Sequence, residues 1–185
     1  DHTISVLCIS KDITDRKHAE QELYYLSNHD SLTGLYNRAF LEGELDRLQA
    51  SRLFPISIIV VDMDNLKLAN DQYGHLAGDE LIRCTAQILR QPFRTEDIIA
   101  RTGGDEFVIL LPETNITNAQ EAVDRLRANV TEQADPPIRL SIGLSTGMEG
   151  DHLHTVMRTA DDLMYQEKAI HKKQPPLYWA ALENR

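Results

Sequence analysis

The sequence predicts an α+β domain in which a mixed β-sheet packs against helices. Two observations support this fold class. Segments with helical and strand-like patterns alternate along the chain, as expected when helices cover a sheet. A β-hairpin around residues 97–111 interrupts that alternation, which implies that parallel and antiparallel strands share one sheet. The expected arrangement is related to the ferredoxin-like fold and differs from a doubly wound parallel sheet.

The beginning of the chain differs from the rest. Residues 3–10 are apolar on nearly both faces and predict one strand, which cannot form a sheet alone. Residues 15–29 carry apolar residues at helical spacing among charged ones: Ala19, Leu23 and Leu26. This stripe suits pairing with another helix, and packing on the chain's own domain would explain it equally well. We expect a remnant of an upstream domain over residues 1–14, followed by a linker helix.

The other elements follow from periodicity. Apolar residues three and four apart predict helices at 38–51, at 65–71, in a longer segment that stops near Pro92, at 119–132 and at 152–172. Apolar and β-branched runs predict strands at 56–61, on both sides of the hairpin turn and at 138–145, with a small edge strand at 177–181. The run at 56–61 is almost continuously apolar, which predicts a strand at the centre of the sheet, covered on both faces.

Composition restricts the function. The 185 residues suit one ordinary domain, and 42% apolar with 26% charged residues is typical of a globular protein. A net charge of −10 argues against binding to nucleic acid, which requires a basic surface. The chain has no signal pattern and no apolar run of about 20 residues, the length of a membrane span. We therefore expect a cytoplasmic domain with no membrane segment in this fragment; missing N-terminal regions could still tether the intact protein.

The hairpin turn carries the first candidate for chemistry. Gly103 and Gly104 tolerate positive φ, so we expect the chain to reverse there, directly before Asp105 and Glu106. Two adjacent acids beside open backbone suit a hard cation and its phosphates. An ordinary solvated turn is an equal explanation of the hairpin alone.

A second acid follows the predicted central strand. If that strand lies beside the hairpin, Asp62 meets the two hairpin carboxylates at one edge of the sheet. With the backbone carbonyl of Met63, they would form a Mg²⁺ site that leaves positions for phosphate oxygens. Asp62 alone could equally be a loop cap.

Three polar residues farther along could hold a nucleotide. Lys67 could bind phosphate, while Asn70 and Asp79 offer an amide and a carboxylate for the polar edge of a purine. The simpler alternatives are that Asn70 ends one helix and Asp79 begins the next as caps.

Four motifs, in order, resemble the GGDEF family, the diguanylate cyclases: Asp30-Ser-Leu-Thr-Gly-Leu-Tyr-Asn-Arg38, Asp62-Met-Asp-Asn-Leu-Lys-Leu-Ala-Asn-Asp71, Gly74-His-Leu-Ala-Gly-Asp79 and Arg101-Thr-Gly-Gly-Asp-Glu-Phe107. The resemblance covers roughly residues 28–173, within a domain expected over 30–185. It implies a central five-stranded sheet surrounded by helices, like that of nucleotidyl cyclases and the polymerase palm. It also implies condensation of two GTP into cyclic di-GMP and two pyrophosphates, across a homodimer of half-sites.

The resemblance also implies residue roles. Asp62, the Met63 carbonyl and Asp105 would hold two Mg²⁺ ions per half-site, with Mn²⁺ as the alternative. Glu106 would be a further ligand or would help to deprotonate the ribose 3′-hydroxyl. Lys67 would hold the phosphates. The guanine contacts would come from Asn70 and Asp79, in a pocket that is lined by Leu66 and His75.

An inhibitory site is implied as well. Arg94 and Asp97 form the R-x-x-D pattern upstream of the signature, where the family binds cyclic di-GMP as an inhibitor, and Arg125 is a further contact. By itself this pattern would be an ordinary surface pair.

The chain departs from the family pattern in two places. Leu66 stands where phenylalanine is usual. The usual Tyr-x-Ala-Lys-x-x-Gly-Arg reads Tyr165-Gln-Glu-Lys-Ala-Ile-His-Lys172. Lys168 is kept and would contact phosphate, but Lys172 keeps only the charge of the arginine and loses its bidentate fork.

Three functions agree with parts of this sequence. An active cyclase, with an upstream sensor in cis, agrees with most of the motifs; the opening segment resembles the end of a PAS sensor domain. A non-catalytic receptor for GTP or cyclic di-GMP is favoured only by the altered last helix. A polymerase-like enzyme would use the same sheet and the same metal-binding acids, but a net charge of −10 does not suit binding to a nucleic-acid template.

Overall fold

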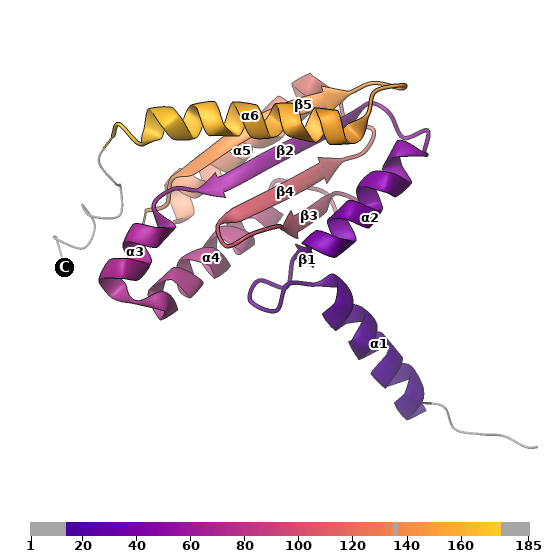
Figure 1. Ribbon diagram of the computed structural model, residues 1–185, viewed down its shortest axis with the longest axis horizontal. Helices are drawn as coiled ribbons and strands as arrows, with labels where there is room; N and C mark the ends of the chain where they lie inside the picture. Colours follow the sequence, from indigo (N-terminus) through magenta and orange to yellow (C-terminus); the bar gives the residue numbers. More distant parts are fainter. Residues whose placement is uncertain (1–13, 135–136, 175–185) are drawn as a thin grey trace, which may run out of the picture.

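The computed structural model describes residues 14–134 and 137–174. Its five strands form one sheet in the order β1-β3-β4-β2-β5 (Figure 1). They are β1 Tyr36–Asn37, β2 Ile56–Met63, β3 Ile98–Arg101, β4 Glu106–Leu111 and β5 Leu140–Gly147. β1 runs parallel to β3, and the other neighbours are antiparallel. The prediction of a mixed sheet surrounded by helices is confirmed.

The strand predictions differ from the structure in position. β2 is fully buried and paired on both sides, but the central strand is β4, because β2 lies next to the edge strand β5. The two-residue strand β1 was not predicted, since it lies in a segment rich in turn residues. The strands predicted at 3–10 and 177–181 lie outside the described residues.

Six helices occur in the described part of the chain. They are α1 Thr14–Asn28, α2 Arg38–Gln49, α3 Leu66–Tyr73, α4 His75–Arg90, α5 Ile116–Gln133 and α6 Leu153–His171. Each predicted helix is present, with ends that shift by up to three residues because caps and turns decide where a helix starts and stops. For example, the Asn37 side chain accepts a hydrogen bond from the Phe40 amide and begins α2.

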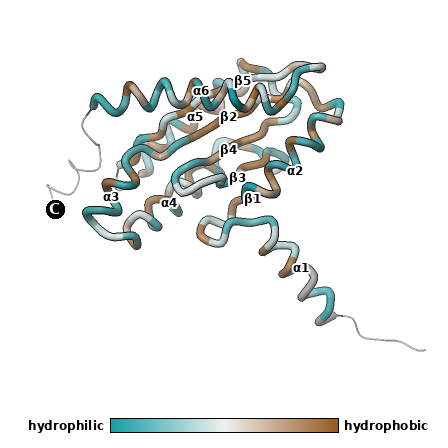
Figure 2. Tube along the Cα trace, viewed as in Figure 1, coloured by the Kyte–Doolittle hydropathy of each residue, from teal (hydrophilic) through white to brown (hydrophobic). Residues whose placement is uncertain are grey.

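Two apolar layers hold the helices on opposite faces of the sheet. Side chains alternate along a strand, so Ile59 and Val61 of β2 pack with the buried residues of α3, α4 and α5. Ile58 and Val60 point the other way and pack with α2 and α6. Figure 2 shows these hydrophobic strands enclosed by helices with hydrophilic outer positions. The side chains of Asp62 and Glu106 lie on the face of the sheet that α2 and α6 cover, because each stands two residues from a valine that packs in that layer, Val60 and Val108.

The approach of α6 to β5 depends on one glycine. A Cβ atom at Gly143 would collide with the backbone carbonyl oxygen of Ala160 and the backbone nitrogen of Met164. The missing side chain therefore lets α6 lie directly on β5, and this contact places the last turns of α6 near the end of β2.

Helix α1 projects away from the sheet (Figure 1). Leu23 and Leu26 are 67% and 60% exposed. The alternative in which this stripe packs on its own domain is therefore wrong for these two residues; the side chain of Ala19 is not described. Among the described residues, no helix combines the length and the apolar character that crossing a membrane would need.

Candidate functional site

The hairpin lies beside β2, as expected. Asp62 is the cross-strand partner of Glu106, and the Met63 amide donates a 2.9 Å hydrogen bond to the Asp105 carbonyl. The acids of the two motifs therefore meet at one end of the sheet. This adjacency makes the solvated-turn explanation of the hairpin insufficient.

The glycines of the turn act differently from the prediction. Neither Gly103 nor Gly104 adopts positive φ, so the expected reason for them is wrong. A Cβ atom at Gly103 would lie 3.0 Å from Oε2 of Glu106, whereas one at Gly104 would meet nothing within 4 Å. The absence of a Cβ atom at Gly103 therefore leaves room for the Glu106 carboxylate in this position.

Asp62 is the most unusual acid of the site. It is 1% exposed, and burial raises its pKa to about 6, although a hydrogen bond from Lys168 opposes the shift. The Lys168 ammonium, on α6, lies 2.5 Å from Oδ2. Oδ1 is buried and accepts no hydrogen bond. A buried acceptor without a protein donor is costly, so this oxygen is available to a cation or to a bound water.

A divalent cation fits that free oxygen. Asp105 is close enough to raise the pKa of Asp62 further by charge repulsion. Residues 14–134 and 137–174 contain no group of three or more His, Cys, Asp or Glu side chains placed to hold a metal. Mg²⁺ is commonly bound by one or two carboxylates together with substrate phosphates. Asp62 and Asp105 match that requirement, with Glu106 exposed beside them.

The residues expected to hold a nucleotide lie on α3 and α4. Lys67 is exposed in the first turn of α3. Asn70 lies within α3, and its Oδ1 is buried with no hydrogen-bond partner. A Cβ atom at Gly78 would collide with that oxygen, so the glycine of α4 makes room for the Asn70 amide.

The capping alternatives are wrong for Asn70 and Asp79. Gly74 is the C-cap of α3 and the N-cap of α4, and Asp79 is the fifth residue of α4. His75 begins α4 and is exposed, whereas Leu66 is 8% exposed and belongs to the apolar core.

The altered end of α6 makes contacts that the sequence did not predict. His171 Nδ1 lies 2.7 Å from Asp64 Oδ2, and the Ser141 hydroxyl donates to Asp64 Oδ1 at 2.8 Å. Glu167 accepts a 2.6 Å hydrogen bond from the Ile142 amide of the edge strand. The departures at 167 and 171 were visible in the sequence, but their partners on β5 were not. Lys172 lies over the Tyr165 ring, 5.9 Å from its centroid.

The R-x-x-D segment separates two cavities. One, of about 270 Å³, is lined by Arg94, Asp97 and Arg125 together with other residues, so the three expected inhibitory-site residues lie around one hollow. The Asp97 carboxylate accepts a 2.7 Å hydrogen bond from the Arg94 amide, and burial raises its pKa. The Arg94 guanidinium itself remains exposed.

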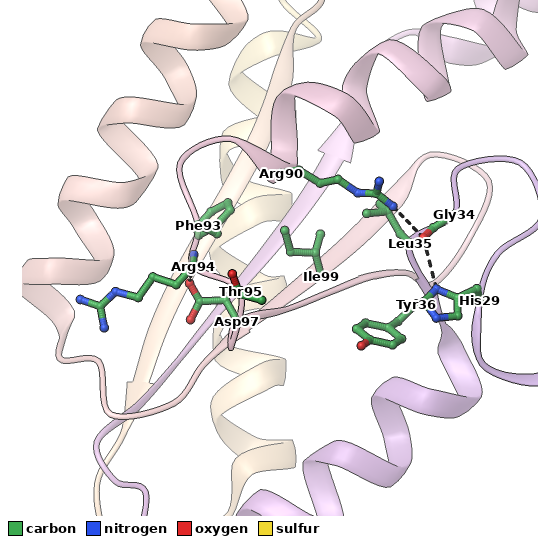
Figure 3. Close-up of a pocket in the computed structure, with 10 residues that line it drawn as sticks. All are labelled: His29, Gly34, Leu35, Tyr36, Arg90, Phe93, Arg94, Thr95, Asp97 and Ile99. Atoms are coloured by element: carbon green, nitrogen blue, oxygen red, sulfur yellow. Dashed lines mark hydrogen bonds between the residues drawn. The ribbon is translucent and has the colours of Figure 1, made fainter. Parts of the chain in front are cut away.

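The second cavity, of about 290 Å³, lies between this segment and the turn after α1 (Figure 3). Figure 3 shows the Arg90 guanidinium directed at the Gly34 carbonyl, 2.6 Å away, with the His29 ring on the same oxygen at 3.2 Å. Arg94 and Asp97 line this cavity too. The R-x-x-D segment therefore adjoins the base of α1.

An ion pair also connects the base of α1 to the hairpin. Arg101 lies 3.1 Å from Asp30, and its other amino group donates to the Gly104 carbonyl at 2.9 Å. Burial favours the protonated form of Asp30, but hydrogen bonds from Thr33 and Arg101 outweigh it and lower its pKa. Stacked rings extend the junction, from Tyr25 through His29 and Tyr36 to Phe40.

The chain is similar to proteins of known families. A family model described as "Diguanylate cyclase, GGDEF domain" matches residues 27–174. Diguanylate cyclase DgcM of Escherichia coli K12 is 32% identical over 88% of this chain and 41% of its own length. A diguanylate cyclase of Vibrio cholerae is 33% identical over 97% of this chain and 59% of its own length. The chain thus spans about half the length of these relatives.

A solved structure gives the same result. The coiled coil and GGDEF domain of DgcB from Caulobacter crescentus, in complex with c-di-GMP, superposes with a TM-score of 0.77 at 28% identity, covering 84% of this chain and 87% of that one. The family model, the relatives and the fold agree with the motifs at the sheet edge. The chain belongs to the GGDEF family of diguanylate cyclases.

Proposed function

We propose that this domain condenses two molecules of GTP into cyclic di-GMP with release of two pyrophosphates. The observation that carries the proposal is the buried Asp62 carboxylate, which has one oxygen on Lys168 and the other without a donor, beside the Asp105–Glu106 hairpin. A buried acid beside an open acidic turn suits a cation that carries a triphosphate.

Each residue has a role in the proposed half-site. Asp62, the Met63 carbonyl and Asp105 would hold two Mg²⁺ ions, with Mn²⁺ as the alternative, and the bound ions would lower the pKa of the attacking hydroxyl. Lys67 and Lys168 bind phosphate, and Lys172 adds positive charge from the next turn of α6.

The nucleotide base is held at the other end of the site. Asn70 and Asp79 bind the guanine edge, where the Asn70 Oδ1 still lacks a donor. A guanine N–H group would supply the missing donor. His75 lines the pocket from the start of α4, while Leu66 supports it from the core.

In the reaction, the ribose 3′-oxygen of one GTP attacks the α-phosphorus of the other. The new O3′–P bond forms as the bond to the pyrophosphate oxygen breaks. The hydroxyl proton passes to Glu106, which lies at the open end of the hairpin. Because each subunit holds one GTP, both bonds require two half-sites that face each other.

The dimer gives α1 its role. We place its exposed Leu23 and Leu26 against the same helix of a second copy. An upstream sensor in cis would set the relative alignment of the half-sites through α1, and the Asp30–Arg101–Gly104 contacts connect its base to the catalytic hairpin.

The product regulates the enzyme at a second site. Cyclic di-GMP would bind in the cavity lined by Arg94, Asp97 and Arg125. Two arginines suit its phosphates, and the carboxylate of Asp97 accepts hydrogen bonds from guanine.

The test is to incubate the protein, in a preparation shown to be dimeric, with GTP and Mg²⁺ and to separate the products by chromatography. We expect cyclic di-GMP from the unaltered chain and from Asp71→Asn, an exposed acid that has no role in the site. Glu106→Gln should lower the rate by about a hundredfold or more. No product at high protein concentration would refute the proposal.

A non-catalytic receptor is the second reading. It is favoured by the altered end of α6, where Glu167 and His171 make structural contacts and Lys172 lies over Tyr165. Calorimetry that shows GTP or cyclic di-GMP binding, together with no turnover by the dimer, would favour this function.

A further inference from the structure

The turn between β2 and α3 carries much of the proposed nucleotide site. Its first residue, Asp64, follows the metal-binding segment directly, and Asn65 then takes a left-handed conformation with φ 64°. Helix α3 starts at the next residue and carries Lys67 and Asn70. The position of Asp64 therefore determines how the metal ligands and α3 are placed relative to each other.

Asp64 is held by three contacts. Its amide donates to the Arg139 carbonyl at 3.0 Å, which fixes the backbone to the start of β5. The Ser141 hydroxyl donates to one carboxylate oxygen at 2.8 Å, and His171 Nδ1 lies 2.7 Å from the other. Because a carboxylate only accepts hydrogen bonds, Nδ1 of His171 carries the proton in this contact.

These contacts are buried. The side chains of Asp64 and His171 are 5% and 16% exposed, and Ser141 is fully buried. A hydrogen bond to a buried carboxylate is stronger and more directional than one in water.

The last turn of α6 is itself anchored. Glu167, one turn before His171, accepts from the Ile142 amide at 2.6 Å and pairs with Arg127 of α5 at 2.9 Å. Lys168 lies between the two and reaches Asp62. The same turn thus contacts β5, the metal-binding end of β2 and the turn that leads to α3.

We propose that His171 is a positioning residue for nucleotide binding, which acts by holding Asp64 and thereby the β2–α3 turn. This inference rests on the proposed function of the site. The family pattern has glycine at position 171, which would leave the Asp64 side chain with Ser141 alone. The histidine therefore supplies a support for the metal and phosphate contacts that a chain with the family pattern lacks.

The test measures binding of a GTP analogue with a methylene group between the α- and β-phosphorus atoms, by calorimetry with Mg²⁺. We expect His171→Gly to bind it about tenfold more weakly, the effect of losing one hydrogen bond to a charged group. Ile170→Gly is the matched control, because it places the same helix-weakening residue at an exposed neighbour; its affinity should change less than about twofold.

A conservative variant separates positioning from general stability. His171→Asn offers an amide donor where Nδ1 lies, so it should recover affinity to within about threefold of the unaltered chain. In turnover, His171→Gly should raise the KM for GTP while kcat changes by less than about threefold. If His171→Gly does not fold, Ser141→Ala removes the other side-chain partner and should weaken binding by about threefold.

Two results would overturn the inference: equal affinity in His171→Gly and Ile170→Gly, or no recovery in a folded His171→Asn. Failure of the proposed enzyme activity can be distinguished from failure of the role of His171. The expected binding differences in a chain that makes no cyclic di-GMP would support the role of His171 and refute the enzyme.

Discussion

The contact between Lys168 and Asp62 gives a prediction about stability as well as function. Replacing Lys168 with methionine keeps most of the side-chain volume but leaves the Asp62 carboxylate without its donor. Asp62 is almost fully buried, while the lysine side chain is 25% exposed. Exposed pairs contribute about 0–1 kcal/mol and breaking a buried pair costs about 3–5, so we expect about 2 kcal/mol of lost unfolding free energy.

The loss should depend on pH. The pKa of Asp62 in the folded chain, about 6, exceeds the ordinary aspartate value of 3.8, because burial disfavours the charged carboxylate. Ionised Asp62 therefore costs stability as the pH rises through about 6, and Lys168 offsets that cost. At about pH 5 the carboxyl is largely protonated, so Lys168→Met should then cost less than about 1 kcal/mol.

Urea unfolding with a chelator present would measure this at about pH 5 and about pH 8. A double-mutant cycle with Asp62→Asn isolates the pair, and its coupling energy should be about 2 kcal/mol at the higher pH only. Lys172→Met, at the C-cap of α6, is the control and should show no pH-dependent loss. Additive effects of Lys168→Met and Asp62→Asn at both pH values would refute the reasoning.

Three further predictions follow. Gly143→Ala should lower the unfolding free energy by about 2–3 kcal/mol, because the new Cβ pushes α6 off β5; an unchanged urea midpoint would contradict the close packing. Asp30→Asn should destabilise the chain near neutral pH by breaking the ion pair with Arg101. The difference in stability between the variant and the unaltered chain should shrink as the pH falls through the lowered pKa of Asp30. A loss in thermal stability that does not depend on pH would argue against the ion pair. Arg94→Ala should relieve inhibition by added cyclic di-GMP while the initial rate stays within about twofold of that of the unaltered chain. The control Arg52→Ala, at an exposed loop position, should leave the inhibition unchanged. Unchanged inhibition in Arg94→Ala would mean that Arg94 is an ordinary surface residue.

Local pattern was sufficient to predict much of the fold. The apolar run that ends at Asp62 and the hairpin that ends at Leu111 each have an unambiguous period and clear boundaries. Strand order was less accessible, since the central place of β4 depends on which edges pair and no local signal reports that. The strand β1 consists of two residues and follows from its partner β3 rather than from its own sequence.

The candidate site also contains features that the sequence predicted and features that it did not. The placement of Asp62 beside the hairpin acids agrees with the structure. The sequence marked the end of each strand by a change from apolar to polar residues, so these acids were assigned to strand ends. The reason for Gly103 was wrong, since the glycine makes room for Glu106 and the turn needs no positive φ. Ser141 and His171 meet Asp64 from positions 77 and 107 residues away, and no spacing rule in one sequence predicts contacts at that separation.

In the proposed reaction, one pair of half-sites joins two GTP molecules. The most direct test measures pyrophosphate and cyclic di-GMP together in a single reaction of the dimeric protein with GTP and Mg²⁺. We expect two pyrophosphates for each cyclic di-GMP formed, with both products lost in Glu106→Gln. Pyrophosphate release without cyclic di-GMP, or neither product from a dimer that binds GTP, would contradict it.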